Sequence, residues 1–128
     1  MSKPIPASQS ATSSRKAPAC PDAGDFIWLE FFPQKGREQD QRRCAIVLSP
    51  LAYNLKTSLC VVCPITSQVK GNPFEVALPD GFPVAGVVLS DHVKSLDWRA
   101  RNWKFICGPE PKVTKDVLAK IKALIGIS

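Results

Sequence analysis

The sequence has little of what most enzyme classes need. It contains one histidine, His92, and it carries no P-loop, no G-x-S-x-G nucleophile motif, no H-E-x-x-H zinc motif and no dinucleotide fingerprint. No acidic cluster has the composition of a catalytic magnesium site, which disfavours two-metal hydrolysis of phosphodiesters. Whatever chemistry the chain performs must therefore rely on a short list of other side chains.

Membrane-spanning and disulfide-stabilised architectures are also disfavoured. No apolar run reaches the roughly 18 residues that a membrane span needs, and the N-terminus lacks the apolar core of a signal peptide, so we expect a cytoplasmic protein. The 5 cysteines are an odd number and do not indicate a disulfide framework. Cys60 and Cys63 form a C-x-x-C, but strand residues three apart point to opposite faces, and no second pair completes a zinc set. We expect ordinary buried thiols.

The chain does carry positive charge. Its 128 residues fit one domain, and the formal net charge of +6 favours polyanionic partners such as nucleic acid without naming one. Residues 1–22 are rich in Ser, Pro and Ala and are predicted to be a disordered basic tail, with a folded domain over residues 23–128. The tail either adds weak electrostatic attraction to RNA or is a passive leader.

Short apolar segments separated by breakers predict a mostly β fold with a C-terminal helix. The segment over residues 44–49 is apolar on both faces, which is typical of a central strand in a curved sheet or half-barrel. Pro64 indicates an edge or a bend, and "PLAYNLKT" is predicted to be a loop. The predicted strands are "DFIWLEFF", residues 44–49, "SLCVVCPIT", "PFEVAL", "GVVLS" and "RNWKFIC".

A helix is predicted at the C-terminal end. Thr114 is its expected N-cap, and Gly126 suits its C-terminal stop. An apolar stripe with helical spacing predicts the face that lies across the sheet. The stripe consists of Val117, Leu118, Ile121, Leu124 and Ile125.

One reaction of a polyanion fits the available groups, namely metal-free transesterification of RNA. The 2′-hydroxyl attacks the neighbouring phosphorus, which requires a base, an acid and cations that stabilise the developing charge. In "GREQDQRRCAIVLSP", Glu38 offers a carboxylate base and Arg43 a bidentate phosphate ligand directly before the apolar strand. The alternative is a solvated ion pair within a loop, and these two residues alone favour that alternative.

The sequence resembles the MazF/PemK family of toxin–antitoxin endoribonucleases, the mRNA interferases. The resemblance rests on "GDFIWLEFFPQKGREQ", "RRCAIVLSPLAYNLKT", "CPITSQVKGNPFEV", "GVVLSDHVKSLDWRAR" and the helix ending "LIG". It implies a small SH3-like β-barrel of the MazF/PemK/CcdB type, usually a homodimer, in the bacterial cytoplasm. It also implies cleavage of single-stranded RNA without metal or cofactor, leaving 2′,3′-cyclic phosphate and 5′-hydroxyl ends. A MazE-like antitoxin with an acidic C-terminal segment would block the site.

The resemblance also implies roles for individual residues. Arg43 matches the essential arginine, as acid and phosphorane stabiliser, and Glu38 matches a proposed proton acceptor. Thr66 matches a threonine whose hydroxyl donates to a phosphate oxygen, although a bond to the backbone at the strand end is the alternative. Phe31 either stacks on a base or belongs only to the core. The implied RNA contacts are Phe31, Gln39, Asn54, Ser67, Gln68, Lys70, Lys94 and Ser95.

Four positions depart from the family pattern and bear on specificity more than on activity. Phe32 stands where an acidic residue is frequent, Cys44 replaces proline, Asn72 replaces tyrosine and His92 replaces glutamine. His92 could be a base, an RNA contact or a structural residue. The segment "DWRAR" is either a basic RNA patch or a structural turn with its tryptophan packed. Two alternative functions remain open, a gyrase-poisoning toxin of related fold and a catalytically impaired relative that still binds RNA or antitoxin.

Overall fold

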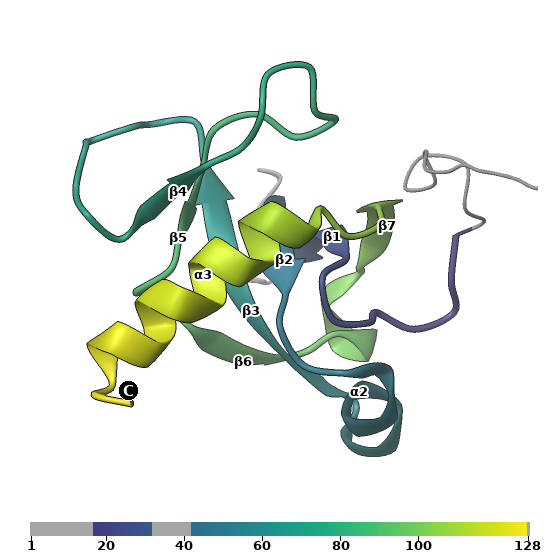
Figure 1. Ribbon diagram of the computed structural model, residues 1–128. Helices are drawn as coiled ribbons and strands as arrows, with labels where there is room; N and C mark the ends of the chain where they lie inside the picture. Colours follow the sequence, from purple (N-terminus) through teal and green to yellow (C-terminus); the bar gives the residue numbers. More distant parts are fainter. Residues whose placement is uncertain (1–16, 32–41, 128) are drawn as a thin grey trace, which may run out of the picture.

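The computed structural model describes residues 17–31 and 42–127, which form an antiparallel sheet with two α-helices and one 3-10 turn (Figure 1). Along the sheet the strands follow the order β4-β5-β3-β2-β1-β7, and β6 pairs with the first half of β3. Because β4 and β7 end this path, the sheet is open within the described residues. The predicted class, mostly β with a C-terminal helix, is confirmed. The strands are β1 (Phe26–Glu30), β2 (Arg42–Val47), β3 (Leu59–Thr66), β4 (Glu75–Ala77), β5 (Val87–Leu89), β6 (Lys94–Asp97) and β7 (Lys104–Cys107).

The sheet is buried on both faces, and this explains the continuous apolar sequence of β2. Along β2, Ile46 packs into one core cluster while Ala45 and Val47 pack into a second. β3 alternates in the same way, so Cys63 joins the first cluster and Cys60 the second. The prediction that these two thiols point to opposite faces is confirmed. Burial raises the pKa of each to about 12, which keeps both thiols neutral.

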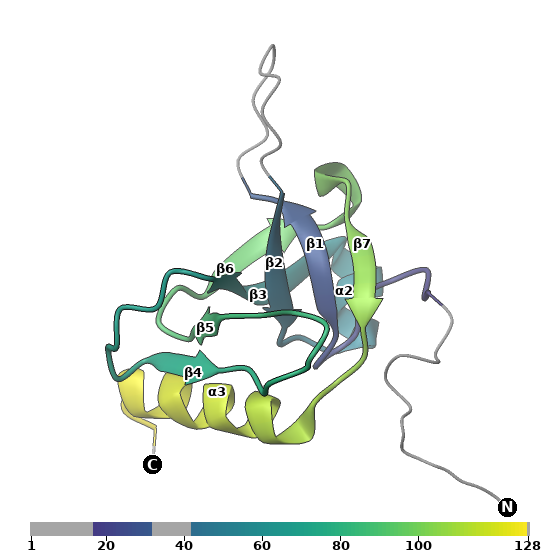
Figure 2. The same ribbon diagram turned by 90° about the horizontal axis from the view of Figure 1, so that it is seen from above.

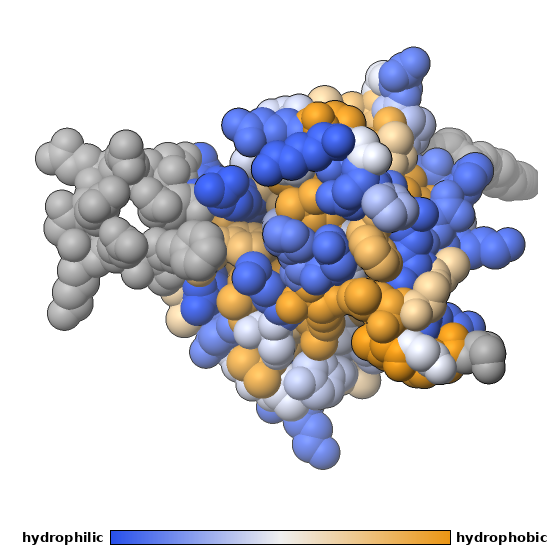
Figure 3. Space-filling view, turned by 90° about the vertical axis from the view of Figure 1, so that its left-hand side faces the viewer, coloured by the Kyte–Doolittle hydropathy of each residue, from blue (hydrophilic) through white to orange (hydrophobic). Residues whose placement is uncertain are grey.

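The first core cluster is covered by α3 (Pro111–Leu124), which lies beside β4 (Figure 2). Val113 and Val117 are its buried residues, whereas Leu118 is 41% and Leu124 46% exposed. Only part of the predicted stripe therefore faces the sheet. The predicted N-cap Thr114 is wrong, because the Glu110 side chain accepts the Lys112 N–H and Pro111 begins the helix. Three apolar residues at the C-terminal end of α3 are exposed, namely Leu124, Ile125 and Ile127. Figure 3 shows apolar side chains gathered at this end of the helix.

Pro64 lies where β3 changes its neighbour. Residues 59–62 of β3 pair with β6, whereas Ile65 and Thr66 pair with β5. On its other side, Pro64 faces Ala45 of β2. Because proline has no N–H to donate, it suits the point where one edge of the strand passes from one partner to the next. The prediction that Pro64 marks an edge or a bend therefore corresponds to a change of partner along one edge of β3.

Two elements differ from the sequence prediction. The segment predicted as a loop contains helix α2 (Leu51–Thr57), and β6 was not predicted as a strand. The N-cap residue of α2, Pro50, makes no side-chain cap bond, and instead the Leu51 N–H donates to Asp22 Oδ1 at 2.8 Å. This cap comes from 29 residues away in the sequence, so no local pattern could have revealed it.

Asn54 of α2 is fully buried and joins three segments of the chain. Its Nδ2 donates to the carbonyls of Pro21 and Ser49, both at 2.9 Å, and its Oδ1 accepts the Ser49 hydroxyl at 2.6 Å. Its backbone carbonyl accepts the indole N–H of Trp98 at 3.0 Å. The prediction that Asn54 contacts an RNA base is therefore wrong, because its amide is enclosed and already bonded on both sides.

The predicted start of the domain at residue 23 falls within a described range. Cys20 and Pro21 are buried, so the packed part begins before residue 23. Residues 1–16 lie outside the described residues, and for them the disordered tail stays a prediction. Neither of the two α-helices in the described ranges has the length and apolarity to cross a membrane.

Replacing Asn54 should destabilise the protein strongly. In Asn54→Ala the Ser49 hydroxyl and two buried carbonyls lose partners, and we expect the free energy of unfolding to fall by about 3 kcal/mol. Urea denaturation followed by tryptophan fluorescence measures this. Leu55→Ala on the same helix, at a side chain that is 54% exposed, is the control and should change it by less than about 1 kcal/mol. Equal stability of Asn54→Ala and wild type would contradict this role.

Candidate active site

Three adjoining hollows lie where β2 and β3 reach the same end of the sheet. The first has a volume of about 440 Å³, the second about 220 Å³ and the third about 240 Å³. Thr66 lines all three, and Arg43 lines the first and the second. These two residues therefore mark the centre of the candidate site.

The pairing of β2 with β3 brings Arg43 and Thr66 together. The ladder places Ala45 opposite Pro64 and Val47 opposite Val62. Extending this register by two residues puts Arg43 opposite Thr66, on the same face of the two strands. Further along the two strands, the residues of this face belong to the second core cluster. Arg43 and Thr66 therefore lie at the edge of that core, where the face becomes accessible to solvent.

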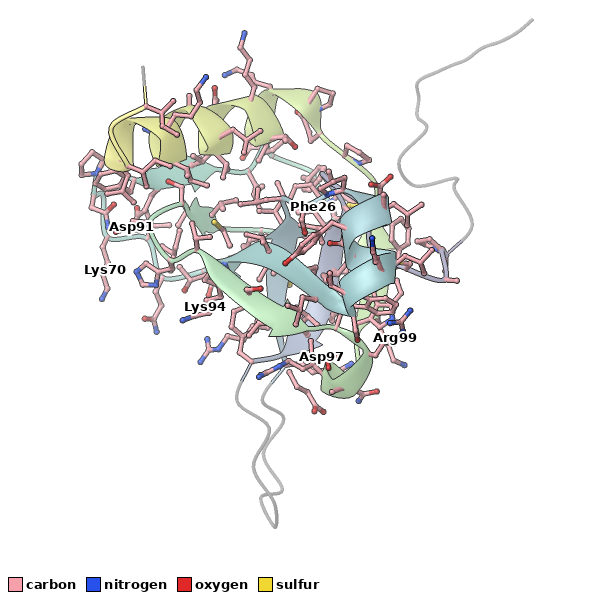
Figure 4. The ribbon with its side chains drawn as sticks, turned by 90° about the horizontal axis from the view of Figure 1, so that it is seen from below. Phe26, Lys70, Asp91, Lys94, Asp97 and Arg99 are labelled. Carbon is pink, nitrogen blue, oxygen red and sulfur yellow. The ribbon has the colours of Figure 1, made fainter. Side chains whose placement is uncertain are left out.

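Residues of β1 and β6 complete the same face. Phe31, directly after β1, is 4% exposed and belongs to the second core cluster, yet it also lines the second hollow. On β6, Lys94 lies opposite Val62, and two residues further back His92 lines the second and third hollows. Figure 4 shows Lys70 and Lys94 projecting on the same side of the molecule. The aromatic ring of Phe31 and several cationic groups therefore surround Arg43 and Thr66.

The Thr66 hydroxyl is held by the backbone that follows it. Its Oγ1 accepts the N–H of Gln68 at 3.1 Å, which is the strand-end bond that the sequence left as an alternative. That bond occupies an acceptor position and leaves the hydroxyl proton free to be donated to a phosphate oxygen.

Gly86 lies directly against the backbone of Thr66. A Cβ at residue 86 would come within 2.2 Å of the Thr66 carbonyl oxygen, and the φ of this residue is +118°. This position therefore requires glycine.

The charge around the site is mainly positive. Arg42 and Arg43 line the first hollow, Lys94 the second and Lys70 the third. Among the described residues that line these hollows, Glu75 is the one carboxylate. The Arg42 guanidinium lies 5.6 Å from the ring centre of Trp28, an arrangement that holds the cation over an aromatic surface. The site is therefore built to attract an anion.

Cys44 is the one thiol that lines the first hollow. Burial raises its pKa, so the side chain is a neutral thiol rather than a thiolate at pH 7. The expectation that cysteine in place of proline at this position affects the chemistry little stays a prediction. Among the described residues, no group of three or more His, Cys, Asp or Glu side chains is placed to hold a metal ion.

Most of the predicted site residues meet at these hollows, and a few do not. Ser95 of β6 lies opposite Val61, so by the pleat of the strand it faces away from Lys94, and it lines none of the three hollows. Glu38, Gln39 and the substituted position Phe32 lie outside the described residues. The predicted residues found together are Phe31, Arg43, Thr66, Ser67, Gln68, Lys70 and Lys94, joined by the substituted positions Cys44, Asn72 and His92.

The "DWRAR" segment is a structural turn. Trp98 is 4% exposed, and the Arg99 guanidinium lies 4.4 Å from the centre of its ring. Arg101 donates from Nη1 to the carbonyls of Glu30 and Phe31, and so holds the end of β1 beside the site. Sequence reasoning did not identify Arg42, Trp28 or Glu75, because each becomes part of the site only through pairing between strands.

Comparison with known proteins agrees with this geometry. Residues 22–125 match the profile of a family described as "PemK-like, MazF-like toxin of type II toxin-antitoxin system". The "Endoribonuclease toxin MazF" of Escherichia coli K12 is 49% identical over 106 residues, which are 83% of this chain and 95% of that protein.

Two crystal structures from Deinococcus radiodurans share the fold. MazF (form I) aligns with a TM-score of 0.77 and 49% identity, over 86% of this chain and 100% of that one. The MazE–MazF structure (form II) aligns with a TM-score of 0.77 and 46% identity, over 87% of this chain and 100% of that one. With a family match over most of its length and a relative 49% identical, the chain belongs to the PemK-like, MazF-like toxins of type II toxin–antitoxin systems.

Proposed function

We propose that this endoribonuclease toxin cuts single-stranded RNA by transesterification, without a metal ion, at a site centred on Arg43 and Thr66. The observation that carries the proposal is the pairing of a guanidinium and a hydroxyl on one face of β2 and β3, in hollows with a cationic rim. The gyrase-poisoning alternative has no need of such a pair. The cut is expected to halt translation by removing mRNA.

The chemistry follows from these groups. The ribose 2′-oxygen attacks the adjacent phosphorus, the bond from phosphorus to the 5′-oxygen breaks, and the products are a 2′,3′-cyclic phosphate and a 5′-hydroxyl. Arg43 can hold two phosphate oxygens at once and stabilise the charge of the phosphorane. Thr66 donates its hydroxyl proton to a non-bridging oxygen. A guanidinium rarely loses its proton in proteins, so we assign Arg43 to charge stabilisation rather than to acid catalysis. The proton that the base takes from the 2′-hydroxyl is returned through water to the departing 5′-oxygen, which leaves as the 5′-hydroxyl.

Two side chains are candidates for the acceptor of the 2′-hydroxyl proton. The resemblance implies that Glu38 takes the proton of the 2′-hydroxyl, and this residue lies outside the described ranges. His92 lines the second and third hollows with Thr66 but is 52% exposed and lies 3.8 Å from Asp91. We therefore keep Glu38 as the proposed base and His92 as a contact for RNA.

The cationic site also bears on the partners of the protein. We propose a homodimer in the bacterial cytoplasm, held inactive by a MazE-like antitoxin whose acidic C-terminal segment occupies the cationic hollows. The net charge of +6 and the rim formed by Arg42, Lys70 and Lys94 suit both an acidic peptide and an RNA backbone. The MazE–MazF structures from Deinococcus radiodurans support this pairing by homology.

Removing the guanidinium should abolish most cleavage. In Arg43→Ala we expect kcat to fall by about 10³-fold, because the developing phosphorane charge loses its main cation. Cleavage of a fluorogenic single-stranded oligoribonucleotide measures this. Lys115→Ala removes the same charge from the exposed side of α3 and is the control, with activity expected to stay unchanged. Wild-type cleavage by Arg43→Ala would remove this residue from the mechanism.

The hydroxyl of Thr66 can be tested separately from its shape. Thr66→Val keeps the volume but removes the donor, and we expect kcat to fall by about 10- to 100-fold. Thr66→Ser keeps the hydroxyl and should retain activity within about fivefold. If valine and serine at this position gave the same rate, the hydroxyl would have no part in the reaction.

The reaction should proceed without divalent metal. Wild-type protein treated with EDTA is expected to cut RNA at an unchanged rate, because the guanidinium and hydroxyl replace the metal as charge stabilisers. Mass spectrometry of the fragments should show 2′,3′-cyclic phosphate and 5′-hydroxyl ends. A strict need for magnesium, or 5′-phosphate ends, would contradict the proposed chemistry.

A further inference from the structure

A carboxylate is out of place in a groove that binds a polyanion. Glu75, the first residue of β4, nevertheless lines the third hollow together with Thr66, Lys70 and His92. Its negative charge opposes the attraction that the surrounding cations exert on RNA phosphates. A residue at this position therefore needs a role that outweighs the electrostatic cost.

The contacts of Glu75 show what that role is. Its Oε1 accepts the N–H of Gly71 at 2.9 Å, and its Oε2 accepts the N–H of Lys70 at 3.0 Å. Both oxygens are thus used on two successive peptide groups of the same loop. Hydrogen bonds to an ionised carboxylate are stronger than neutral ones, and two together fix orientation as well as position. The left-handed conformation of Gly71, with φ at +82°, gives the turn that presents these N–H groups.

The loop held in this way is one wall of the groove. We call residues 67–72 the wall segment, which runs from the end of β3 toward β4 and contributes Gln68, Lys70 and Asn72 to the third hollow. The Thr66 hydroxyl ties its start through the N–H of Gln68 at 3.1 Å. At its far end, the Asn72 carbonyl accepts the Glu75 N–H at 3.2 Å.

Further bonds hold the residues that follow the wall segment. The Asn72 side chain accepts the N–H of Phe74 at 2.8 Å, and Lys120 of α3 donates to the Pro73 carbonyl at 2.7 Å. Buried Ser90 donates through its hydroxyl to the Phe74 carbonyl. Between these anchors, the carboxylate of Glu75 is the side chain that holds the middle of the wall segment.

We propose that Glu75 is a positioning residue that holds the wall segment rigid and thereby determines which bases are accepted beside the cleaved bond. The inference rests on the proposed function, because it assigns this groove to RNA. Glu75 acts through Lys70 and Gly71 rather than on the reacting atoms. Phosphate contacts attract RNA of any sequence, whereas a wall of fixed shape can select among bases by hydrogen bonding and fit.

The test compares Glu75→Gln with wild type and with Asp80→Asn. Glutamine keeps the shape but offers one acceptor oxygen, so one of the two N–H groups loses its partner. Asp80→Asn removes the same charge from an exposed residue that lines none of the three hollows. Circular dichroism first confirms that all three proteins are folded.

Two measurements are made on each protein. Amide hydrogen exchange of Lys70 and Gly71, followed by NMR, should be more than about tenfold faster in Glu75→Gln and unchanged in Asp80→Asn. Sequencing the 5′ ends of fragments from a long unstructured RNA identifies the preferred site. For that site against single-base variants, the ratio of kcat/KM should fall by about tenfold in Glu75→Gln, while kcat at the preferred site stays within about twofold.

Other results would overturn the proposal in distinguishable ways. An unchanged cleavage profile in Glu75→Gln would show that the wall segment does not select bases. A loss of kcat at every site with RNA binding intact would make Glu75 a catalytic base instead of a positioning residue. The same relaxation in Asp80→Asn would trace the effect to net charge. A wild-type protein that cuts no RNA would refute both the proposed function and the role of Glu75 in selection. The exchange measurement would then report only on the hydrogen bonds from Lys70 and Gly71 to Glu75.

Discussion

The register between β2 and β3 is the constraint on which the site depends. It is fixed by burial on both faces of the sheet, since Ile46 and Cys63 enter one core cluster while Val47 and Val62 enter the other. A slip of one residue would exchange the side chains between two closely packed cores that they no longer fit, so packing on both faces opposes it. The alignment of Arg43 with Thr66 is therefore stabilised by apolar residues that take no part in chemistry.

The surroundings of this pair are rigid for a related reason. Arg101 donates to two carbonyls at the end of β1, and Trp98 belongs to the second core cluster with its indole N–H bonded to the Asn54 carbonyl. The basic "DWRAR" segment thus uses its cations and aromatic ring to fix the scaffold. Preorganised donors stabilise a transition state because they need no reorganisation when charge develops. A guanidinium on a strand anchored in this way meets that requirement better than one on a free loop.

Local patterns in the sequence predicted what local physics determines. Short, nearly continuous apolar runs identified β2 and β3, and the strand spacing of Cys60 and Cys63 predicted that their thiols face opposite ways. The resemblance then placed Arg43 and Thr66 in one site, and the strand register agrees with that placement. The roles of Glu38 and Gln39 stay predictions, because both residues lie outside the described ranges.

Contacts between distant segments are what the sequence could not reveal. Helix α2 takes its first cap from Asp22. The resemblance assigned Asn54 to RNA, whereas its amide and its carbonyl are taken up by Pro21 and Trp98, which are distant in the sequence. Glu75 looks like an ordinary strand residue until the loop before it folds back onto its carboxylate. In each case a polar side chain is used by backbone groups that no periodic pattern connects to it.

In this site, the groups that attract RNA differ from the groups that can select among its bases. Arg42, Lys70 and Lys94 attract any polyanion, so charge alone does not distinguish one RNA from another, or RNA from an acidic peptide. Discrimination has to come from groups with direction and shape, namely the aromatic side of the second hollow and the wall segment along the third. The Glu75 carboxylate weakens the attraction of the site for phosphate groups, but its two oxygens hold the wall segment in place. Without that support, a flexible wall segment would discriminate less between bases.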